Sequence, residues 1–237
     1  MMKILIVAAH PDDEVLGCGG TIARMSKEGH DISIAILGEG ITSRYLQRED
    51  ADKKMVRNLH KRSHQVAKIF GVKDLQLFDL PDNRFDTIAL LDIVKILEGL
   101  IEKIKPECIF THHASDLNVD HVLTNRATLI ATRPIIKNTS VKTVLSYEVP
   151  SSTEWAFQTT GPGFRPNIFI DITGTLDIKI DAMQLYDVES RQYPHPRSSE
   201  SLRANASRWG SVSGMKAAEA FELVRYLRGK EKGIFCR

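Results

Sequence analysis

The sequence of 237 residues has few cysteines and no long apolar run. Its three cysteines, Cys18, Cys108 and Cys236, lie far apart and form no CxxC pair, so the sequence predicts neither a disulfide framework nor a cysteine zinc site. Such cysteine usage fits a reducing compartment. The apolar residues 4–9 lead into His-Pro-Asp-Asp-Glu, unlike a signal peptide, and no other run is long enough to cross a bilayer. We therefore expect a cytoplasmic protein without a membrane span.

The chain also has little net charge. Its formal charge of +2 at pH 7 is too small to indicate a nucleic-acid partner. The most basic stretch, residues 53–68, interleaves lysines and arginines with apolar residues, which indicates the solvated face of a helix. With 42% hydrophobic and 26% charged residues, the composition is that of a globular protein that buries a substantial core.

The first two thirds of the sequence alternate between short apolar runs and helical patterns. Residues 3–9 and 31–37 are mostly apolar, and they flank a helical pattern over 15–27, an order that predicts a parallel sheet. The alternation continues with strands at 75–79, 107–112 and 143–149, a long helix that ends near Phe70, and helices at 89–105 and 121–131. We expect an α/β fold: a Rossmann-like three-layer sandwich with a mostly parallel, twisted sheet.

The last third indicates a more irregular C-terminal extension. Residues 150–166 hold three prolines and two glycines, and Pro194 and Pro196 exclude a helix over 193–197. The remaining elements that we expect are a strand at 167–172, a helix at 176–189 and a terminal helix from Ala204 or Met215 to Arg228. No repeat or linker divides the chain. We therefore treat 1–237 as one domain, with an α/β core at 1–150 and a loop-rich, helical extension at 151–237 around the site.

The sequence lacks a glycine-rich phosphate loop as well. Ligands of an open parallel sheet bind at the carboxyl ends of the strands, and a dinucleotide-binding protein carries GxGxxG after its first strand. Here Gly17, Gly19 and Gly20 do not have that spacing, and the acidic turn before them would repel phosphate. A dinucleotide site is therefore disfavoured.

His10, Asp12 and Asp13 in this turn suit a divalent cation instead. Imidazole and carboxylate are natural zinc ligands, and an open site keeps a position for water. Because the side chains of adjacent aspartates diverge, one aspartate as a ligand and the other as a base is the economical division. The alternative is that both only cap the following helix, but a histidine two residues earlier at a strand end favours the metal site.

A second polar segment, residues 111–121, follows the fourth strand. It should lie at the same edge of the sheet, where His121 can supply a third ligand while Asp116 or Asp120 orients an imidazole. An Asx-rich turn with Asp120 as the helix cap is the structural alternative, and both interpretations can hold together.

These segments resemble the PIG-L/LmbE-like family of zinc-dependent N-deacetylases. The resemblance rests on Ala-His-Pro-Asp-Asp-Glu at 9–14 and on Asp-x-Asn-x-Asp-His at 116–121. Residues 147–155, 194–198 and 218–221 are similar to those of a bacterial branch, so the resemblance covers nearly the whole chain. It implies an enzyme that uses metal-activated water to remove the acetyl group from a small-molecule partner, an N-acetylated amino sugar or sugar conjugate.

The resemblance also implies roles for individual residues. His10, Asp13 and His121 are expected to hold Zn²⁺, or another divalent metal such as Fe²⁺ or Co²⁺, and Asp12 to act as general base. Asn118 departs from the pattern, because many members have a histidine there. Its amide can donate to an oxyanion but carries no positive charge. The identity of the sugar and the oligomeric state, including a homo-oligomer, stay open.

Four further side chains complete the candidates. Tyr147 is a second candidate donor to the oxyanion, and His113, His195 or protonated Asp12 would protonate the departing nitrogen. Arg84, after the third strand, either binds a substrate hydroxyl or phosphate or belongs to a plain turn, and the loop after the second strand either covers the site or has no specific role.

Two other functions are alternatives to the deacetylase. The first is a sugar- or nucleotide-binding Rossmann-like module without catalysis, which would have no need of the intact set His10, Asp12, Asp13 and His121. The second, a metal-dependent hydrolase of another bond such as a carbamoyl or phosphate ester, uses the same ligands and stays open.

Overall fold

The computed structural model describes residues 1–134 and 140–228. In this part of the chain one mixed sheet has the strand order β3-β2-β1-β4-β5-β7-β6. Its strands are β1 (Lys3–Ala8), β2 (Asp31–Gly38), β3 (Asp74–Leu80), β4 (Cys108–His112), β5 (Thr143–Tyr147), β6 (Ile168–Asp171) and β7 (Ala218–Tyr226). The α-helices are α1 (Asp13–Lys27), α2 (Lys53–Phe70), α3 (Leu90–Ile104), α4 (Val119–Ala131), α5 (Leu176–Leu185) and α6 (Ser199–Ser213).

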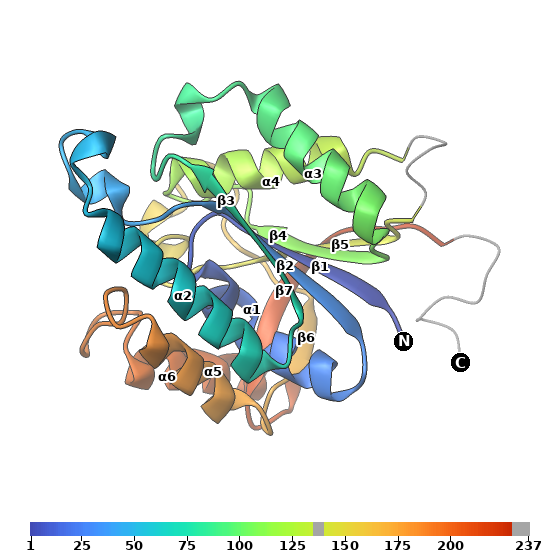
Figure 1. The fold of residues 1–237 in the computed structure, drawn as a ribbon. Coiled ribbons are helices and arrows are strands. Elements are labelled where there is room, and N and C mark those ends of the chain that lie inside the picture. The colour runs from blue at the N-terminus through green and yellow to red at the C-terminus, as the bar shows by residue number, and fades with distance from the viewer. Residues whose placement is uncertain (135–139, 229–237) are drawn as a thin grey trace.

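The molecule has three layers. In Figure 1, α3 and α4 lie on one face of the sheet, and α1, α2, α5 and α6 lie on the other. Neighbouring strands from β3 to β5 run parallel, whereas β7 is antiparallel to both β5 and β6. The predicted Rossmann-like sandwich with a mostly parallel sheet is therefore confirmed.

The central strand β1 is apolar from Ile4 to Ala8 because both of its faces are covered. Ile4, Ile6 and Ala8 belong to one hydrophobic cluster, while Leu5 and Val7 belong to the cluster on the opposite face. All five side chains are at most 1% exposed. Such two-sided burial anchors the strand, so the turn that follows it starts from a rigid support.

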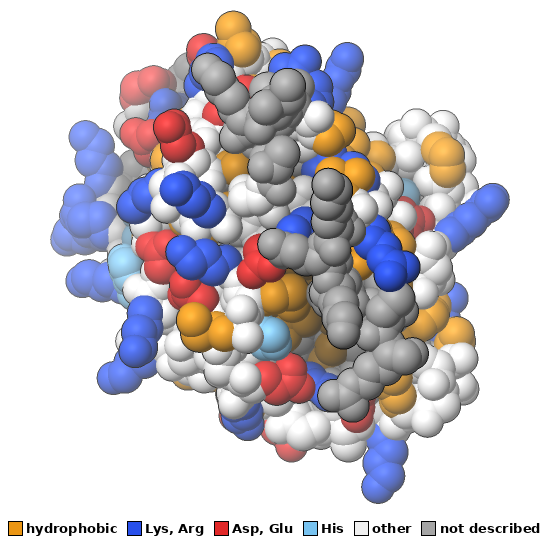
Figure 2. Space-filling model, turned by 90° about the vertical axis from the view of Figure 1, so that its right-hand side faces the viewer, with side chains coloured by type: hydrophobic (Ala, Val, Ile, Leu, Met, Phe, Trp, Pro, Cys, Tyr) orange, Lys and Arg blue, Asp and Glu red, His pale blue; other side chains and the backbone are white. Residues whose placement is uncertain are grey.

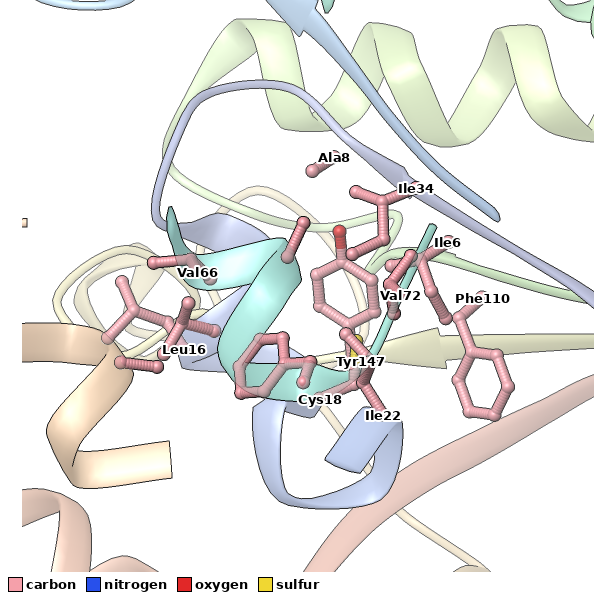
Figure 3. Packing of buried hydrophobic residues seen from close by; sticks show 14 of the residues in the cluster. Ile6, Ala8, Leu16, Cys18, Ile22, Ile34, Val66, Val72, Phe110 and Tyr147 are labelled. Carbon is pink, nitrogen blue, oxygen red and sulfur yellow. The ribbon is translucent and has the colours of Figure 1, made fainter. Parts of the chain in front are cut away.

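Helix α1 packs closely against β5. The ring of Tyr147 lies among Ile6, Cys18 and Ile22 in the first cluster (Figure 3). A Cβ atom on Gly17 would lie only 2.2 Å from this ring. The missing side chain of Gly17 therefore allows the helix to approach the sheet, and this contact positions the start of α1.

The end of the chain differs from the prediction. The expected terminal helix to Arg228 is wrong, because α6 ends at Ser213 and β7 follows. Gly214, at φ 73°, ends the helix in the left-handed conformation that glycine adopts readily. Residues 218–221, Ala-Glu-Ala-Phe, suit a helix or a strand, and pairing with β5 and β6 decides for the strand. The extension therefore completes the sheet.

The surface and the thiols complete the description. On the face of the molecule in Figure 2, basic and acidic side chains are interspersed. Among the helices of residues 1–134 and 140–228, none combines the length and apolar character that a bilayer span requires. Cys18 and Cys108 are buried free thiols, and Cys236 lies outside the described residues.

Candidate active site

Loops after four parallel strands meet at one edge of the sheet. Since β1, β2, β3 and β4 run in the same direction, their carboxyl ends lie together. A pocket of about 210 Å³ opens there, and two residues from the segment between α5 and α6 complete it. The pocket is lined by His10, Pro11, Asp12, Asp13, Gly40, Ile41, Ser43, Arg44, Leu59, Asp82, Asn83, Asn118, His121, Glu189 and Arg197.

Three buried side chains in this pocket form a set of metal donors. Asp13 Oδ2 lies 3.4 Å from His10 Nδ1 and 3.3 Å from His121 Nε2. One donor atom from each residue lies within 4.8 Å of the other two. Two imidazole nitrogens and one carboxylate oxygen match an open zinc-type site, which leaves positions for water and substrate. The residues present therefore fit a divalent cation.

The second ring nitrogen of each histidine faces another carboxylate. His10 Nε2 lies 2.8 Å from Asp120 Oδ2, and His121 Nδ1 lies 3.1 Å from Asp116 Oδ1. Such outer contacts fix the orientation of an imidazole ligand and increase its basicity. The structure thus pairs each expected orienting carboxylate with a different histidine.

The start of α4 differs from the expected cap. The N-cap is Asn118, whose side chain accepts from the N–H of Asp120, so the prediction of Asp120 as the cap is wrong. The Asp120 carboxylate instead accepts from the backbone N–H groups of Asn83 at 2.7 Å and Phe85 at 2.9 Å. It therefore ties the loop after β3 to His10.

The charges of the cluster shift its pKa values. Burial alone would lower the pKa of His121, but Asp13 and Asp116 raise it to about 9. Burial alone would raise the pKa of Asp13, but the charge of His121 and a hydrogen bond with His10 hold it well below its usual range. A proton and a divalent cation therefore compete for the same imidazole.

His112 lies beside the cluster without facing the pocket. Its ring stacks on that of His121 with 4.1 Å between centroids, and its Nε2 accepts from the N–H of Ala9 at 2.8 Å. Burial, reinforced by the neighbouring His121, lowers its pKa to about 3. A neutral His112 therefore supports the ligand ring from behind.

Asp12 occupies the turn between β1 and α1 in a strained conformation. Its φ of 114° is one that residues other than glycine rarely adopt, at a cost of about 1–3 kcal/mol. Glu14 holds the turn: its Oε2 accepts from the Asp12 N–H and its Oε1 from the hydroxyl of Tyr186. Burial raises the pKa of Glu14 to about 7. The turn places Asp12 in the pocket directly beside Asp13.

Arg197 reaches Asp12 from the end of the segment Tyr-Pro-His-Pro-Arg. Its Nη1 donates to Asp12 Oδ2 at 2.7 Å, and its Nε donates to Ser151 Oγ at 2.8 Å. Burial raises the pKa of Asp12 well above its usual value, and the guanidinium of Arg197 opposes that shift. The carboxyl group expected to act as base therefore has a cationic partner.

Charged and polar side chains form the entrance to the pocket. Helix α5 ends at Leu185, before the predicted end at residue 189, so Glu189 lies in irregular chain and contacts Arg44 and Arg197. Asp82 accepts from the Ser43 hydroxyl at 2.6 Å. We call this group the outer wall; it consists of Ser43, Arg44, Asp82, Asn83, Glu189 and Arg197.

His113 and Tyr147 do not line the pocket. His113 Nδ1 lies 3.0 Å from Glu222, on the other side of β4. The Tyr147 hydroxyl is fully buried and donates to the carbonyl of Val7 at 2.7 Å. Both candidates follow or end strands of the correct edge, but their side chains point away from the pocket.

His195 and Arg84 are also outside the lining. The ring of His195 contacts Trp155, with 5.5 Å between centroids, and Arg84 donates to the carbonyl of Leu46 at 3.4 Å. The side chain that enters the pocket from this proline-rich segment is Arg197 instead. The two prolines exclude a helix over this segment, but they do not show which of its residues faces the pocket.

A mostly parallel α/β sandwich, with a His–Asp–His set of candidate metal donors beside a carboxyl group in a polar pocket, has the arrangement of an α/β enzyme. More particularly, the chain belongs to the PIG-L family. The family model described as GlcNAc-PI de-N-acetylase matches residues 5–132, which contain the three donors and Asp12.

Individual relatives agree with this assignment. The chain is 28% identical to the uncharacterized deacetylase YaiS of Escherichia coli, over 70% of the chain and 80% of YaiS. It is 29% identical to 4-oxalmesaconate hydratase of Pseudomonas putida, over 76% and 71% of the two chains. The fold resembles that of N,N'-diacetylchitobiose deacetylase from Pyrococcus horikoshii, with a TM-score of 0.73, 20% identity, and 94% and 84% of the chains covered.

Proposed function

We propose that the protein is a zinc-dependent N-deacetylase that hydrolyses the acetamide of an N-acetylated amino sugar or sugar conjugate. The main support for this proposal is that donor atoms of His10, Asp13 and His121 lie within 4.8 Å of one another in a pocket that Asp12 also lines. The family model, described as a GlcNAc-PI de-N-acetylase, supports an acetylated glucosamine as the substrate class.

Each of these pocket residues has a separate role in the proposed reaction. His10, Asp13 and His121 would hold the metal, which when bound supplies a Lewis acid for the acetamide carbonyl and an activated water. Asp12 accepts a proton from the attacking water, and Arg197 orients its carboxyl group. The amide of Asn118, which lines the pocket, is the donor for the oxyanion.

The departing nitrogen must gain a proton as the carbon–nitrogen bond breaks. His113 and His195 do not line the pocket, whereas Asp12 does. Asp12 therefore returns the proton that it took from water. Burial favours the protonated form of this carboxyl group, which suits a group that must also act as an acid.

Acetate release tests the proposal. Protein with one bound zinc per chain should release acetate from N-acetylglucosamine or its glycosides, and His10→Ala should lose both metal and activity. Asp12→Asn should keep the metal and lose activity by roughly 10²–10⁴-fold. A fully metal-loaded protein with no turnover on any N-acetyl sugar would refute the proposal.

A hydratase is the second candidate, because one relative is named 4-oxalmesaconate hydratase. The same donor set and Asp12 could activate water for addition to a carbon–carbon double bond. The absorbance of a conjugated unsaturated carboxylate would fall on hydration. Loss of absorbance without acetate release from sugars would favour this second reaction.

A further inference from the structure

Glu189 of the outer wall has no role in the hydrolysis described above. Its Oε2 lies 3.3 Å from Arg197 Nη1, and its Oε1 accepts from Arg44 Nη2. Arg44 and Arg197 are the arginines among the described residues that line the pocket, and no lysine is among those residues. The carboxylate of Glu189 therefore binds both guanidinium groups that a substrate in the pocket could contact.

The other contacts of the two arginines are also within the protein. Arg197 donates to Asp12 and to Ser151, and Arg44 donates to the carbonyl of Val188 at 3.3 Å. An anionic substrate group would compete with Glu189 for the positive charge of these guanidinium groups. Weaker pairing would leave the partly buried carboxylate of Glu189 less well compensated, which is unfavourable.

The charge of the outer wall opposes an anion as well. The outer wall has two guanidinium groups and the two carboxylates of Asp82 and Glu189. Its formal charge is therefore zero when Asp12 is left out. A phosphate or carboxylate on the substrate would meet these acidic groups and no free cation of the described lining. A group of the same charge placed next to the binding position is a common means of rejecting a wrong ligand.

The neutral members of the pocket suit sugar hydroxyls. Asn118 Nδ2 donates to Asn83 Oδ1 at 2.8 Å, and Asn83 Nδ2 lies 3.1 Å from the hydroxyl oxygen of Ser43. These uncharged side chains form hydrogen bonds with one another. Sugar hydroxyl groups can replace these hydrogen bonds without separating an ion pair. The pocket of about 210 Å³ is smaller than typical sites for drug-sized ligands, so it accommodates the reacting end of a substrate.

We propose that Glu189 is a specificity-determining residue: by binding Arg44 and Arg197 it restricts the pocket to uncharged N-acetyl sugars and excludes those with a phosphate or carboxylate near the acetamide. The inference rests on the proposed deacetylase function and adds the charge of its substrate. The experiment compares N-acetylglucosamine with N-acetylglucosamine 6-phosphate and N-acetylglucosamine 1-phosphate.

The wild-type protein should have at least about tenfold higher kcat/KM for the uncharged sugar than for either phosphate. Glu189→Gln frees both arginines, so it should shift this ratio about tenfold toward the phosphates. Asp187→Asn is the matched control, since Asp187 pairs with Arg62 at 2.9 Å and does not line this pocket. The control should leave the ratio unchanged.

Two outcomes distinguish the inference from the function on which it rests. If the wild type uses the phosphates as well as the uncharged sugar, Glu189 does not exclude anions, and only the inference fails. If zinc-loaded protein releases acetate from no N-acetyl sugar, these three included, the deacetylase proposal fails and the inference with it. Calorimetric binding of glucosamine and glucosamine 6-phosphate gives a second readout, and thermal unfolding shows whether Glu189→Gln is folded. An unchanged ratio in folded Glu189→Gln also overturns the inference.

Discussion

Arg197 Nη1 donates to Asp12 Oδ2 at 2.7 Å, although 185 residues separate them in the sequence. The bond joins the strained turn after β1 to the segment between α5 and α6. It also gives a cationic partner to a carboxyl group that is 2% exposed. Burial raises the pKa of Asp12 well above its usual value, and the guanidinium of Arg197 acts against that shift, so it favours the charged form that the proposed reaction requires of a base.

Replacing Arg197 should therefore impair turnover more than metal binding. We expect Arg197→Gln to lower kcat roughly 10–100-fold, because Asp12 loses its orientation and its compensating charge. Zinc content should stay at one per chain, since Arg197 is not among the donors. Steady-state kinetics with metal analysis measures both quantities, with Arg203→Gln as a control in a surface ion pair. Loss of zinc in Arg197→Gln would show that the residue supports the metal cluster instead.

The fold could be predicted where one local signal dominates. β1 is an unbroken apolar run after Lys3, and α3 has helical periodicity, so both appear within a few residues of the expected bounds. Residues 218–226 fit a helix or a strand equally, and only the antiparallel pairing with β5 and β6 decides. Such pairing is a tertiary effect that a local pattern does not contain.

The candidate site shows the same limit. His10, Asp13 and His121 could be brought together from the sequence because they follow parallel strands whose carboxyl ends share an edge. Glu189 and Arg197 enter from irregular chain, where no periodicity gives the direction of a side chain. Tyr147 illustrates the reverse error, because the last residue of a strand can face the core as readily as the pocket.

The contact between Asp120 and His10 can be tested for its effect on metal affinity. Asp120→Asn removes the negative charge 2.8 Å from His10 Nε2 while all three donors remain. We expect a loss of zinc affinity of about 10–100-fold, because an outer carboxylate orients the imidazole and increases its basicity. Competition with a chromogenic chelator measures the zinc affinity. The control is Asp92→Asn, at an exposed position of α3. Unchanged affinity in a folded Asp120→Asn would remove this role.

Zinc binding should depend on pH. The pKa of His121 is raised to about 9 by Asp13 and Asp116, against the effect of burial, so at pH 7 the metal-free protein holds a proton on this ring. Zinc must displace that proton, and lowering the pH therefore weakens binding. We expect the affinity to rise about tenfold per pH unit between pH 6 and 8 for each proton released. Calorimetry in buffers of different ionisation enthalpy counts the protons, and a pH-independent affinity would contradict the prediction.

Two glycines in helices provide the last test. Gly17 of α1 faces the Tyr147 ring, which a new Cβ would approach to 2.2 Å, whereas Gly99 of α3 has nothing within 4 Å. Alanine favours a helix over glycine by about 1 kcal/mol, so Gly99→Ala should raise the free energy of unfolding by about that amount. Gly17→Ala should lower it by about 1–3 kcal/mol, because overpacking at the ring outweighs the propensity. Urea unfolding measures both. Equal gains in the two variants would show that α1 can move away from Tyr147 without cost, and that the close packing does not position the start of the helix.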